Sequence, residues 1–200
     1  ALDKVIVDVM AIGNILSSSR LGYEKNLQAI TGKDATVLKI TNELEDFLTN
    51  CNQNDILFLY WAGHGSSNND GCFITYDTEC SCMTHTTIPM NAVRQLIENS
   101  PAKAIISLFD CCYSGAITRA EHTFHDLVAR ELKVTGEGKV IITACTEFQV
   151  AYEMEMEPHG RFTYYLIEGL KGAAADPKGN IPITGLYQYV AEKMKSHSEI

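Results

Sequence analysis

The fold of this chain is decided by residues 105–115, which read IISLFDCCYSG. The apolar run ends abruptly at Asp110, and two cysteines, Cys111 and Cys112, come directly after it. A continuous apolar run is typical of a strand that is buried on both faces of a parallel sheet. Because open α/β folds carry ligands and chemistry at the carboxyl ends of such strands, we expect a thiol at that edge.

A second stretch of the same build lies upstream, at residues 55–65, and reads DILFLYWAGHG. It is also an apolar run, and it ends at His64, which has Gly63 on one side and Gly65 on the other. One strand end therefore offers a nucleophile and the other offers a base. This combination predicts a cysteine peptidase built on the pair.

The length, composition and charge are those of an ordinary globular chain. Two hundred residues suit a single domain with one sizeable core. Hydrophobic residues make up 46% and charged residues 20%, which argues against a disordered or fibrous protein. The net charge of −9 argues against nucleic acid or an anionic membrane as the main partner, because phosphates need a basic surface.

The cysteine count bears on the cellular compartment. The chain contains seven cysteines, an odd number, and their spacing is not that of a small disulfide scaffold. No apolar run approaches the roughly 18 residues of a membrane-spanning helix, and the chain does not open with the pattern of a signal peptide. A reducing cytosol suits these features, so we predict a cytoplasmic protein.

Helix and strand patterns alternate along the chain without internal repeats. Such alternation predicts a doubly wound α/β sandwich. We expect helices at residues 1–19, 41–49, 89–99, 123–133, 162–170 and 184–194, and strands at 26–31, 56–61, 72–76, 104–109 and 140–145. The polar stretch 116–138 is predicted to be a mobile or cleavable connection.

The chemistry of a catalytic cysteine explains why these residue types belong together. A thiol is mostly protonated at neutral pH, so it needs a neighbouring histidine or a positive field to become a thiolate. Histidine also returns a proton to the leaving amine. The glycines beside His64, and Gly115 after Cys112, let the backbone approach closely. Backbone N–H groups at such turns can hold the oxyanion of an acyl-transfer intermediate.

Each residue of the pair has a plain structural interpretation when it is taken alone. A single histidine after a strand is usually a loop or core residue, and a single cysteine in an apolar run is usually part of the core. Two strand ends with this order, this spacing and these flanking glycines are harder to explain in that way. The pair therefore favours a catalytic site over a structural one.

Residues 60–65, YWAGHG, resemble the histidine motif of the caspase-like cysteine peptidases, and residues 110–115, DCCYSG, resemble their cysteine motif. Both motifs are similar to those of the metacaspase and bacterial caspase-like branch. Residues 151–153 and 160–163 also match the downstream pattern of that branch. One departure is Tyr113, which stands where histidine is common in the family. The resemblance extends over nearly the whole chain.

This resemblance implies a caspase-like three-layer α/β/α sandwich with a mostly parallel central sheet, in a single peptidase domain over residues 1–200. It implies that Cys112 is the nucleophile, that Cys111 is a packing residue in the place of a small one, and that His64 is the general base and acid. His64 precedes Cys112 by 48 positions, near the spacing of about 50 that caspases show. The backbone N–H groups of Gly65 and Cys112 are the implied oxyanion hole.

Two acidic residues stand where caspases carry other residue types. Asp110 takes the place of the glutamine two residues before the caspase nucleophile. Glu153 takes the place of the arginine with which caspases bind a substrate aspartate. Two carboxylates predict cleavage after Arg or Lys, because a buried charge needs an opposite partner. The alternatives are a turn-capping role for Asp110, a solvated loop position for Glu153, and Glu147 as the second acid.

We predict no metal centre and no cofactor. Cys72, Cys80, Cys82 and His85 could be taken for zinc ligands, but they lack the paired C-x₂-C spacing of structural zinc sites. Some metacaspases require calcium. A calcium requirement of this chain is implied by the resemblance alone, and no residue pattern supports it independently. The expected partners are protein or peptide substrates with a basic residue before the scissile bond, with no nucleic acid and no membrane.

The resemblance also implies sequence beyond this chain. The caspase-like fold begins with a central strand ahead of a helix that carries an aspartate, and residues 1–16, with Asp8, resemble that helix. We therefore expect the chain to lack an upstream first strand and to be a fragment, with an upstream segment or a regulatory domain in the same protein. In the polar connection, Arg119, Arg130 and Lys133 suit self-cleavage by a peptidase specific for basic residues.

The sequence leaves two other functions open. A caspase-like domain can be a catalytically silent scaffold, although a silent domain has no need to retain both His64 and Cys112. It can also be an effector protease that is active only with a partner domain. Labelling of Cys112 by a substrate-like reagent separates these alternatives from an active peptidase.

Overall fold

A computed structural model of the chain describes residues 2–18, 21, 27–66, 71–111, 138–143 and 159–196. The chain forms two compact units. One comprises Ala1–Ala29 and Ala151–Ile200, and the other comprises Ile30–Val150. His64 and Asp110 both lie in the second unit. That residues 1–200 act as a single peptidase domain stays a prediction.

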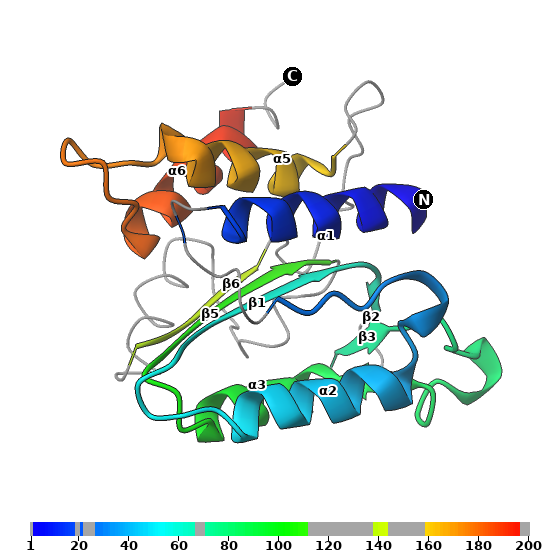
Figure 1. Ribbon diagram of the computed structural model, residues 1–200. Helices are drawn as coiled ribbons and strands as arrows, with labels where there is room; N and C mark the ends of the chain where they lie inside the picture. Colours follow the sequence, from blue (N-terminus) through cyan, green and yellow to red (C-terminus); the bar gives the residue numbers. More distant parts are fainter. Residues whose placement is uncertain are drawn as a thin grey trace. The chain divides into compact units, whose positions relative to one another are not determined.

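The second unit is built on a parallel sheet whose strands lie in the order β1-β5-β6 (Figure 1). Its strands are β1 (Ile56–Ala62), β5 (Ala104–Asp110) and β6 (Lys139–Thr143). Each of them forms at a predicted strand position, because each is an apolar run of the length that suits a buried strand. The central strand, β5, is largely buried, in agreement with the prediction of a buried parallel strand.

Strands β1 and β5 pair in a register that stays constant over seven residues. Ile56 pairs with Ala104 and Ala62 pairs with Asp110, so partners are always 48 positions apart. The two strands run side by side along their whole length and end together. Their carboxyl ends are therefore neighbours at one edge of the sheet.

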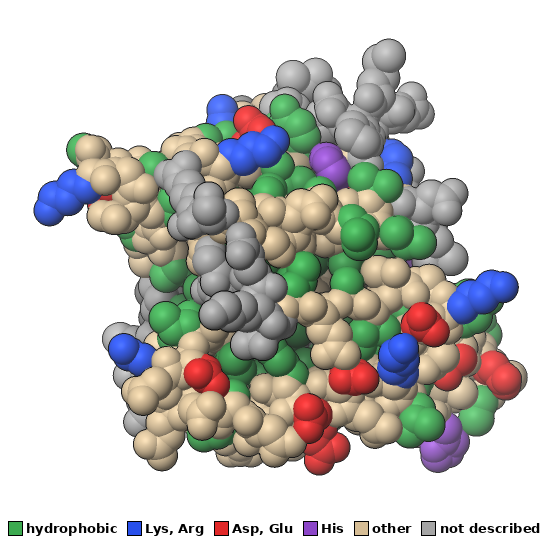
Figure 2. Space-filling model, in the orientation of Figure 1, with side chains coloured by type: hydrophobic (Ala, Val, Ile, Leu, Met, Phe, Trp, Pro, Cys, Tyr) green, Lys and Arg blue, Asp and Glu red, His purple; other side chains and the backbone are tan. Residues whose placement is uncertain are grey.

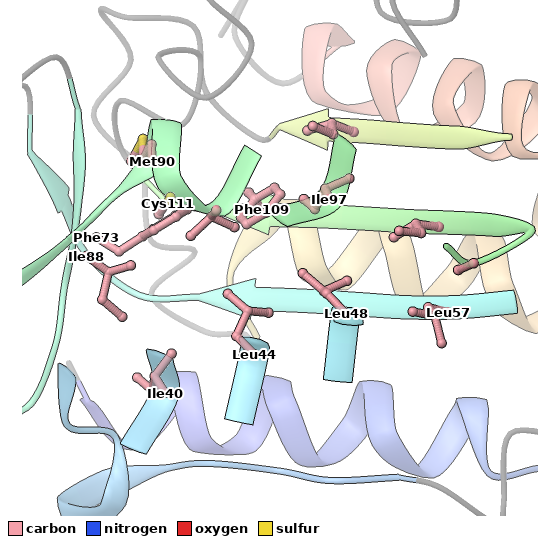
Figure 3. Packing of buried hydrophobic residues seen from close by; sticks show 14 residues of the cluster. Ile40, Leu44, Leu48, Leu57, Phe73, Ile88, Met90, Ile97, Phe109 and Cys111 are labelled. Atoms are coloured by element: carbon pink, nitrogen blue, oxygen red, sulfur yellow. The ribbon is translucent and has the colours of Figure 1, made fainter. Parts of the chain in front are cut away.

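Two helices, α2 (Val37–Thr49) and α3 (Met90–Asn99), pack on one face of this sheet (Figures 1 and 3). Their apolar faces share one core with the strands. This core contains Ile40, Leu44 and Leu48 from α2, Met90, Val93 and Ile97 from α3, and Leu57, Ile105, Phe109 and Ile141 from the strands. Removing this apolar surface from water, at roughly 25 cal/mol per Å², is the main force that holds the helices against the sheet.

Helix α2 begins at Val37, earlier than the predicted start at residue 41. The Thr36 hydroxyl accepts a hydrogen bond from the Lys39 N–H at 3.3 Å, and Asp77 Oδ1 accepts one from the Val37 N–H at 2.9 Å. These two oxygens satisfy N–H groups that have no partner within the helix. The predicted start was wrong because one of the two capping groups comes from 40 positions away.

A second, antiparallel sheet was not predicted from the sequence. Its strands lie in the order β2-β3-β4 and are β2 (Gly65–Ser66), β3 (Cys72–Ile74) and β4 (Thr87–Pro89). Strands of two or three residues show too few positions for an alternating pattern, so only β3 was expected, as part of 72–76. Because β2 begins three residues after β1 ends, this sheet adjoins the carboxyl end of the parallel sheet.

The first unit is helical and consists of α1 (Leu2–Leu16), α5 (Arg161–Glu168), the π-helical turn η6 (Gly169–Ala173) and α6 (Ile183–Ser196). All three α-helices form close to their predicted bounds. Gly169 lets α5 and α6 approach closely, because a Cβ there would lie 2.5 Å from Leu186 Cδ1. Gly172, with a φ of 124°, adopts a backbone conformation that favours glycine and ends the helical run.

One predicted strand, at residues 26–31, is not confirmed, and one predicted helix, at residues 123–133, cannot be compared with the structure. Residues 27–31 belong to no strand, although 26–31 was predicted to be one. The physical reason is exposure: residues 27–29 are exposed, so burial cannot stabilise a strand there. The predicted helix 123–133 lies outside the described residues.

Acidic side chains lie over α2 in Figure 2, and Glu45 and Asp46 of this helix are exposed. They make up a solvated face, in keeping with the net charge of −9. Within the ranges that the structure describes, no helix has the length and apolar character needed to cross a membrane.

Candidate active site

His64 lies just beyond the end of β1, in the short link between β1 and β2, and it is exposed. The backbone of this link is held from two sides. The Gly63 N–H donates to the Asp110 carbonyl at 3.1 Å, and the Ile74 N–H donates to the His64 carbonyl at 3.0 Å. These bonds tie the histidine to the end of β5 on one side and to β3 on the other.

Asp110 is the last residue of β5 and lies opposite Ala62, two residues before His64. It is partly buried. The next residue, Cys111, is only 3% exposed and belongs to the core of the second unit (Figure 3). This burial agrees with the prediction that Cys111 packs in the core.

Cys112, the predicted nucleophile, lies outside the described residues. The strands that lead toward the two candidates are nevertheless described. His64 stands two positions after Ala62, and Cys112 stands two positions after Asp110, and Ala62 and Asp110 are strand partners. The separation of 48 positions between the two candidates is thus the register of the β1–β5 pair. The 48-position spacing of His64 and Cys112 in the sequence therefore equals the spacing of paired residues in β1 and β5.

The two glycines beside His64 occupy different settings. Gly65 begins β2 and pairs with Phe73 of β3. A Cβ at Gly63 would lie 3.4 Å from Nε1 of Trp61, so the indole lies close to the link. The predicted oxyanion hole consists of the N–H groups of Gly65 and Cys112, and the structure describes only Gly65. Its role in binding an oxyanion stays a prediction.

The structure does not describe the second predicted specificity acid. Glu153 and its alternative, Glu147, lie outside the described residues. The described residues also exclude the three basic candidates for self-cleavage, which are Arg119, Arg130 and Lys133. Asp110 is therefore the predicted specificity residue that can be placed, and it lies at the carboxyl edge of the sheet.

The described residues contain no group of three or more His, Cys, Asp or Glu side chains that could hold a metal ion. Cys72 is buried in β3. Cys80, Cys82 and His85 are exposed in the loop between β3 and β4, where Cys80–Cys82 forms the 3₁₀ turn η4. These four residues are therefore not assembled as a zinc site, and a calcium requirement is left as a prediction.

Sequence reasoning missed three aromatic residues at the His64 link. The ring centroids of Trp61 and Phe73 are 4.5 Å apart, and those of Phe73 and Phe109 are 5.4 Å apart. Trp61 and Phe109 could have been found, because both precede a candidate residue by three positions in paired strands. Phe73 gave no such signal, because β3 has only three residues.

The caspase domain family matches residues 1–199 of this 200-residue chain. No curated protein gives a significant match. Together with the parallel order β1-β5-β6 and its helices, the family match confirms the predicted α/β, caspase-like fold class. It also confirms the predicted enzyme class, a cysteine-type peptidase. The chain belongs to the caspase domain family.

Proposed function

We propose that this protein is a cysteine endopeptidase that uses Cys112 as the nucleophile and His64 as the base, and that it cleaves peptide bonds after Arg or Lys. The observation that supports the pair best is the register of β1 and β5. The last paired residues, Ala62 and Asp110, each stand two positions before one of the candidates. The 3.1 Å bond from the Gly63 N–H to the Asp110 carbonyl continues this pairing toward His64.

In the proposed reaction, His64 takes the thiol proton of Cys112, and the thiolate attacks the carbonyl carbon of the scissile bond. The N–H groups of Gly65 and Cys112 donate hydrogen bonds to the oxyanion that forms. The imidazolium then gives its proton to the leaving amine as the C–N bond breaks, and a thioester remains. Water, deprotonated by His64, hydrolyses the thioester and restores the thiol.

The proposed preference for basic residues rests on Asp110. Alternate residues of β5, Ile105 and Phe109, face the core under α2 and α3. Side chains alternate along a strand, so Asp110 points to the other face of the sheet, away from that core. A carboxylate at the carboxyl edge, two positions before the nucleophile, can bind the cation of a substrate Arg or Lys. Glu153, or Glu147 in its place, would supply the second carboxylate.

The rest of the proposal follows the resemblance to the metacaspase and bacterial caspase-like branch. We assign the chain to that branch and expect it to act in the cytoplasm on protein or peptide substrates. The stretch 116–138 would be the mobile or cleavable connection. A calcium requirement would follow from the same resemblance alone.

The test is labelling with an arginyl chloromethyl ketone, followed by mass spectrometry of the modified peptide. We expect labelling of the wild type and of Cys111→Ala, and none of Cys112→Ala or His64→Ala. Fluorogenic peptides that differ only in the residue before the scissile bond then measure specificity. Labelling that survives Cys112→Ala would place the nucleophile elsewhere, and faster cleavage after Asp would overturn the basic preference. An unlabelled wild type would favour a silent scaffold or an effector that needs a partner domain.

A further inference from the structure

The two strands that lead toward the proposed catalytic pair carry aromatic residues at matching positions. Trp61 of β1 is the direct partner of Phe109 in β5. Both side chains lie on the core face of the sheet, where Phe109 is 1% exposed and Trp61 is partly buried against the same core. Each is three residues ahead of its candidate, Trp61 before His64 and Phe109 before Cys112.

A third ring comes from the other sheet. Phe73 of β3 is fully buried, and it lies against Trp61 with ring centroids 4.5 Å apart and against Phe109 with centroids 5.4 Å apart. The backbone of Phe73 pairs with Gly65, the residue directly after His64. Figure 3 shows Phe73 and Cys111 toward one end of the core cluster, Leu57 toward the other end, and Phe109 between them.

The aromatic stack of Trp61, Phe73 and Phe109 therefore joins three backbone segments. One leads into His64, one leads toward the nucleophile, and one pairs with the residue that follows His64. Two glycines flank His64, so no neighbouring side chain restrains the histidine from its own link. Among the described residues, backbone hydrogen bonds hold the link, and the rings pack between the strands from which the link extends.

We propose that this aromatic stack is a positioning device, which sets the distance and orientation between His64 and the nucleophile; this inference rests on the proposed function. A base must lie within hydrogen-bond reach of the proton that it takes. A displacement of about 1 Å can lower the rate of an enzyme on the order of 100-fold. Rings that touch both strands and β3 resist such a displacement, because a packed core is not continuously deformable.

The buried Nε1 of Trp61 has no hydrogen-bond partner in the part of the chain that the structure describes. The contact that the indole does make is the packing of its ring against Phe73, with ring centroids 4.5 Å apart. The proposal thus predicts that a phenylalanine at position 61 preserves kcat better than an aliphatic residue does.

The test uses variants of Phe73 and Trp61 with two readouts. We expect Phe73→Leu to lower kcat about 10- to 100-fold with KM changed less than about 3-fold. Trp61→Leu should also lower kcat, and Trp61→Phe should keep kcat much closer to the wild-type value. The matched control is Leu57→Ala, which opens the same core roughly 13 Å away along β1. It should lower the midpoint of thermal unfolding and leave kcat near the wild-type value.

The second readout does not depend on peptide cleavage. Alkylation of Cys112 by iodoacetamide is followed between pH 5 and pH 9 by mass spectrometry, in the wild type and in His64→Ala. A thiolate paired with an imidazolium reacts at lower pH than a lone thiol. We expect the profile of Phe73→Leu to move toward that of His64→Ala, and the profile of Leu57→Ala to stay with the wild type.

The two hypotheses fail in different ways. A Phe73→Leu protein that keeps the wild-type alkylation profile and kcat would overturn the positioning role and leave the peptidase proposal standing. A loss of kcat in Leu57→Ala as large as that in Phe73→Leu would also overturn it, since general loosening of the core would then suffice. A wild-type profile that His64→Ala leaves unchanged would overturn the proposed catalytic pair, and the positioning role with it.

Discussion

Nδ1 of His159 lies 2.7 Å from Oδ1 of Asp8, a contact between residues 151 positions apart. The other carboxylate oxygen of Asp8 accepts a hydrogen bond at 3.2 Å from the N–H of Gly160, the N-cap residue of α5. Asp8 is 3% exposed. One buried carboxyl group on α1 therefore holds the beginning of α5.

Burial raises the pKa of Asp8 above its ordinary value of 3.8. Desolvation outweighs the hydrogen bonds from His159 and Gly160 and the nearby charges of His159 and Lys4, which all lower the pKa. The folded protein thus holds the proton more tightly than the unfolded chain. The resulting stabilisation is full below pH 3.8 and is lost as the pH rises through the raised pKa.

Comparison with Asp8→Asn measures this effect, because the amide cannot ionise. We expect the free energy of unfolding of the wild type, relative to Asp8→Asn, to decrease as the pH rises from 3.5 to 7. Urea unfolding at several pH values gives the difference. Parallel stability curves for the two proteins would contradict the raised pKa. Asp8→Ala should cost about 1–3 kcal/mol, because it leaves the Gly160 N–H unsatisfied.

Asp110→Asn should weaken the selection of basic residues. Loss of one carboxylate removes a charge-assisted contact to the substrate cation, so we expect the kcat/KM ratio of an Arg peptide to a Gln peptide to fall about 10- to 100-fold. Cleavage rates of the two fluorogenic peptides give this ratio. Glu45→Gln on the exposed face of α2 is the charge control and should leave it unchanged. An unaltered ratio in Asp110→Asn would support the turn-capping role instead.

Ser107→Ala should stabilise the protein by about 1 kcal/mol. Ser107 is fully buried in the middle of β5, between Leu59 and Ile141 in the neighbouring strands. Its hydroxyl has no hydrogen-bond partner among the described residues, so the substitution removes an unsatisfied polar atom. Urea unfolding measures the change, with the exposed Ser81→Ala as a control that should stay within about 0.5 kcal/mol. A loss of stability would mean that the hydroxyl is satisfied.

Lys139→Met should destabilise the protein by about 2 kcal/mol. Nζ of Lys139 donates to the carbonyls of Glu98 at 2.7 Å and Ser100 at 2.8 Å, at the end of α3. The residue is 8% exposed, so water cannot replace the lost donor at these carbonyls. Lys171→Met is the control, because Lys171 is exposed and its ion pair with Glu168 is 3.8 Å long. Equal thermal midpoints for the two variants would contradict a special role for Lys139.

The long elements were predictable because their signals are local. The strands at Ile56–Ala62 and Ala104–Asp110 are continuous apolar runs, and Met90–Asn99 has a helical apolar face. The positions of His64 and Cys112, each just after one of these two strands, could be predicted from the same local pattern. The short strands β2 and β4 were missed, because pairing with β3 stabilises them and no pattern of their own marks them.

The sequence by itself determined the α/β class, the resemblance to the caspase family and the 48-position separation of His64 from Cys112. Only the tertiary structure decided that this separation is a strand register, that Phe73 lies between Trp61 and Phe109, and that Asp8 holds Gly160. The physical reason is the range of the interactions. Local patterns record how each segment buries its apolar face, whereas these contacts depend on which distant segment provides the partner.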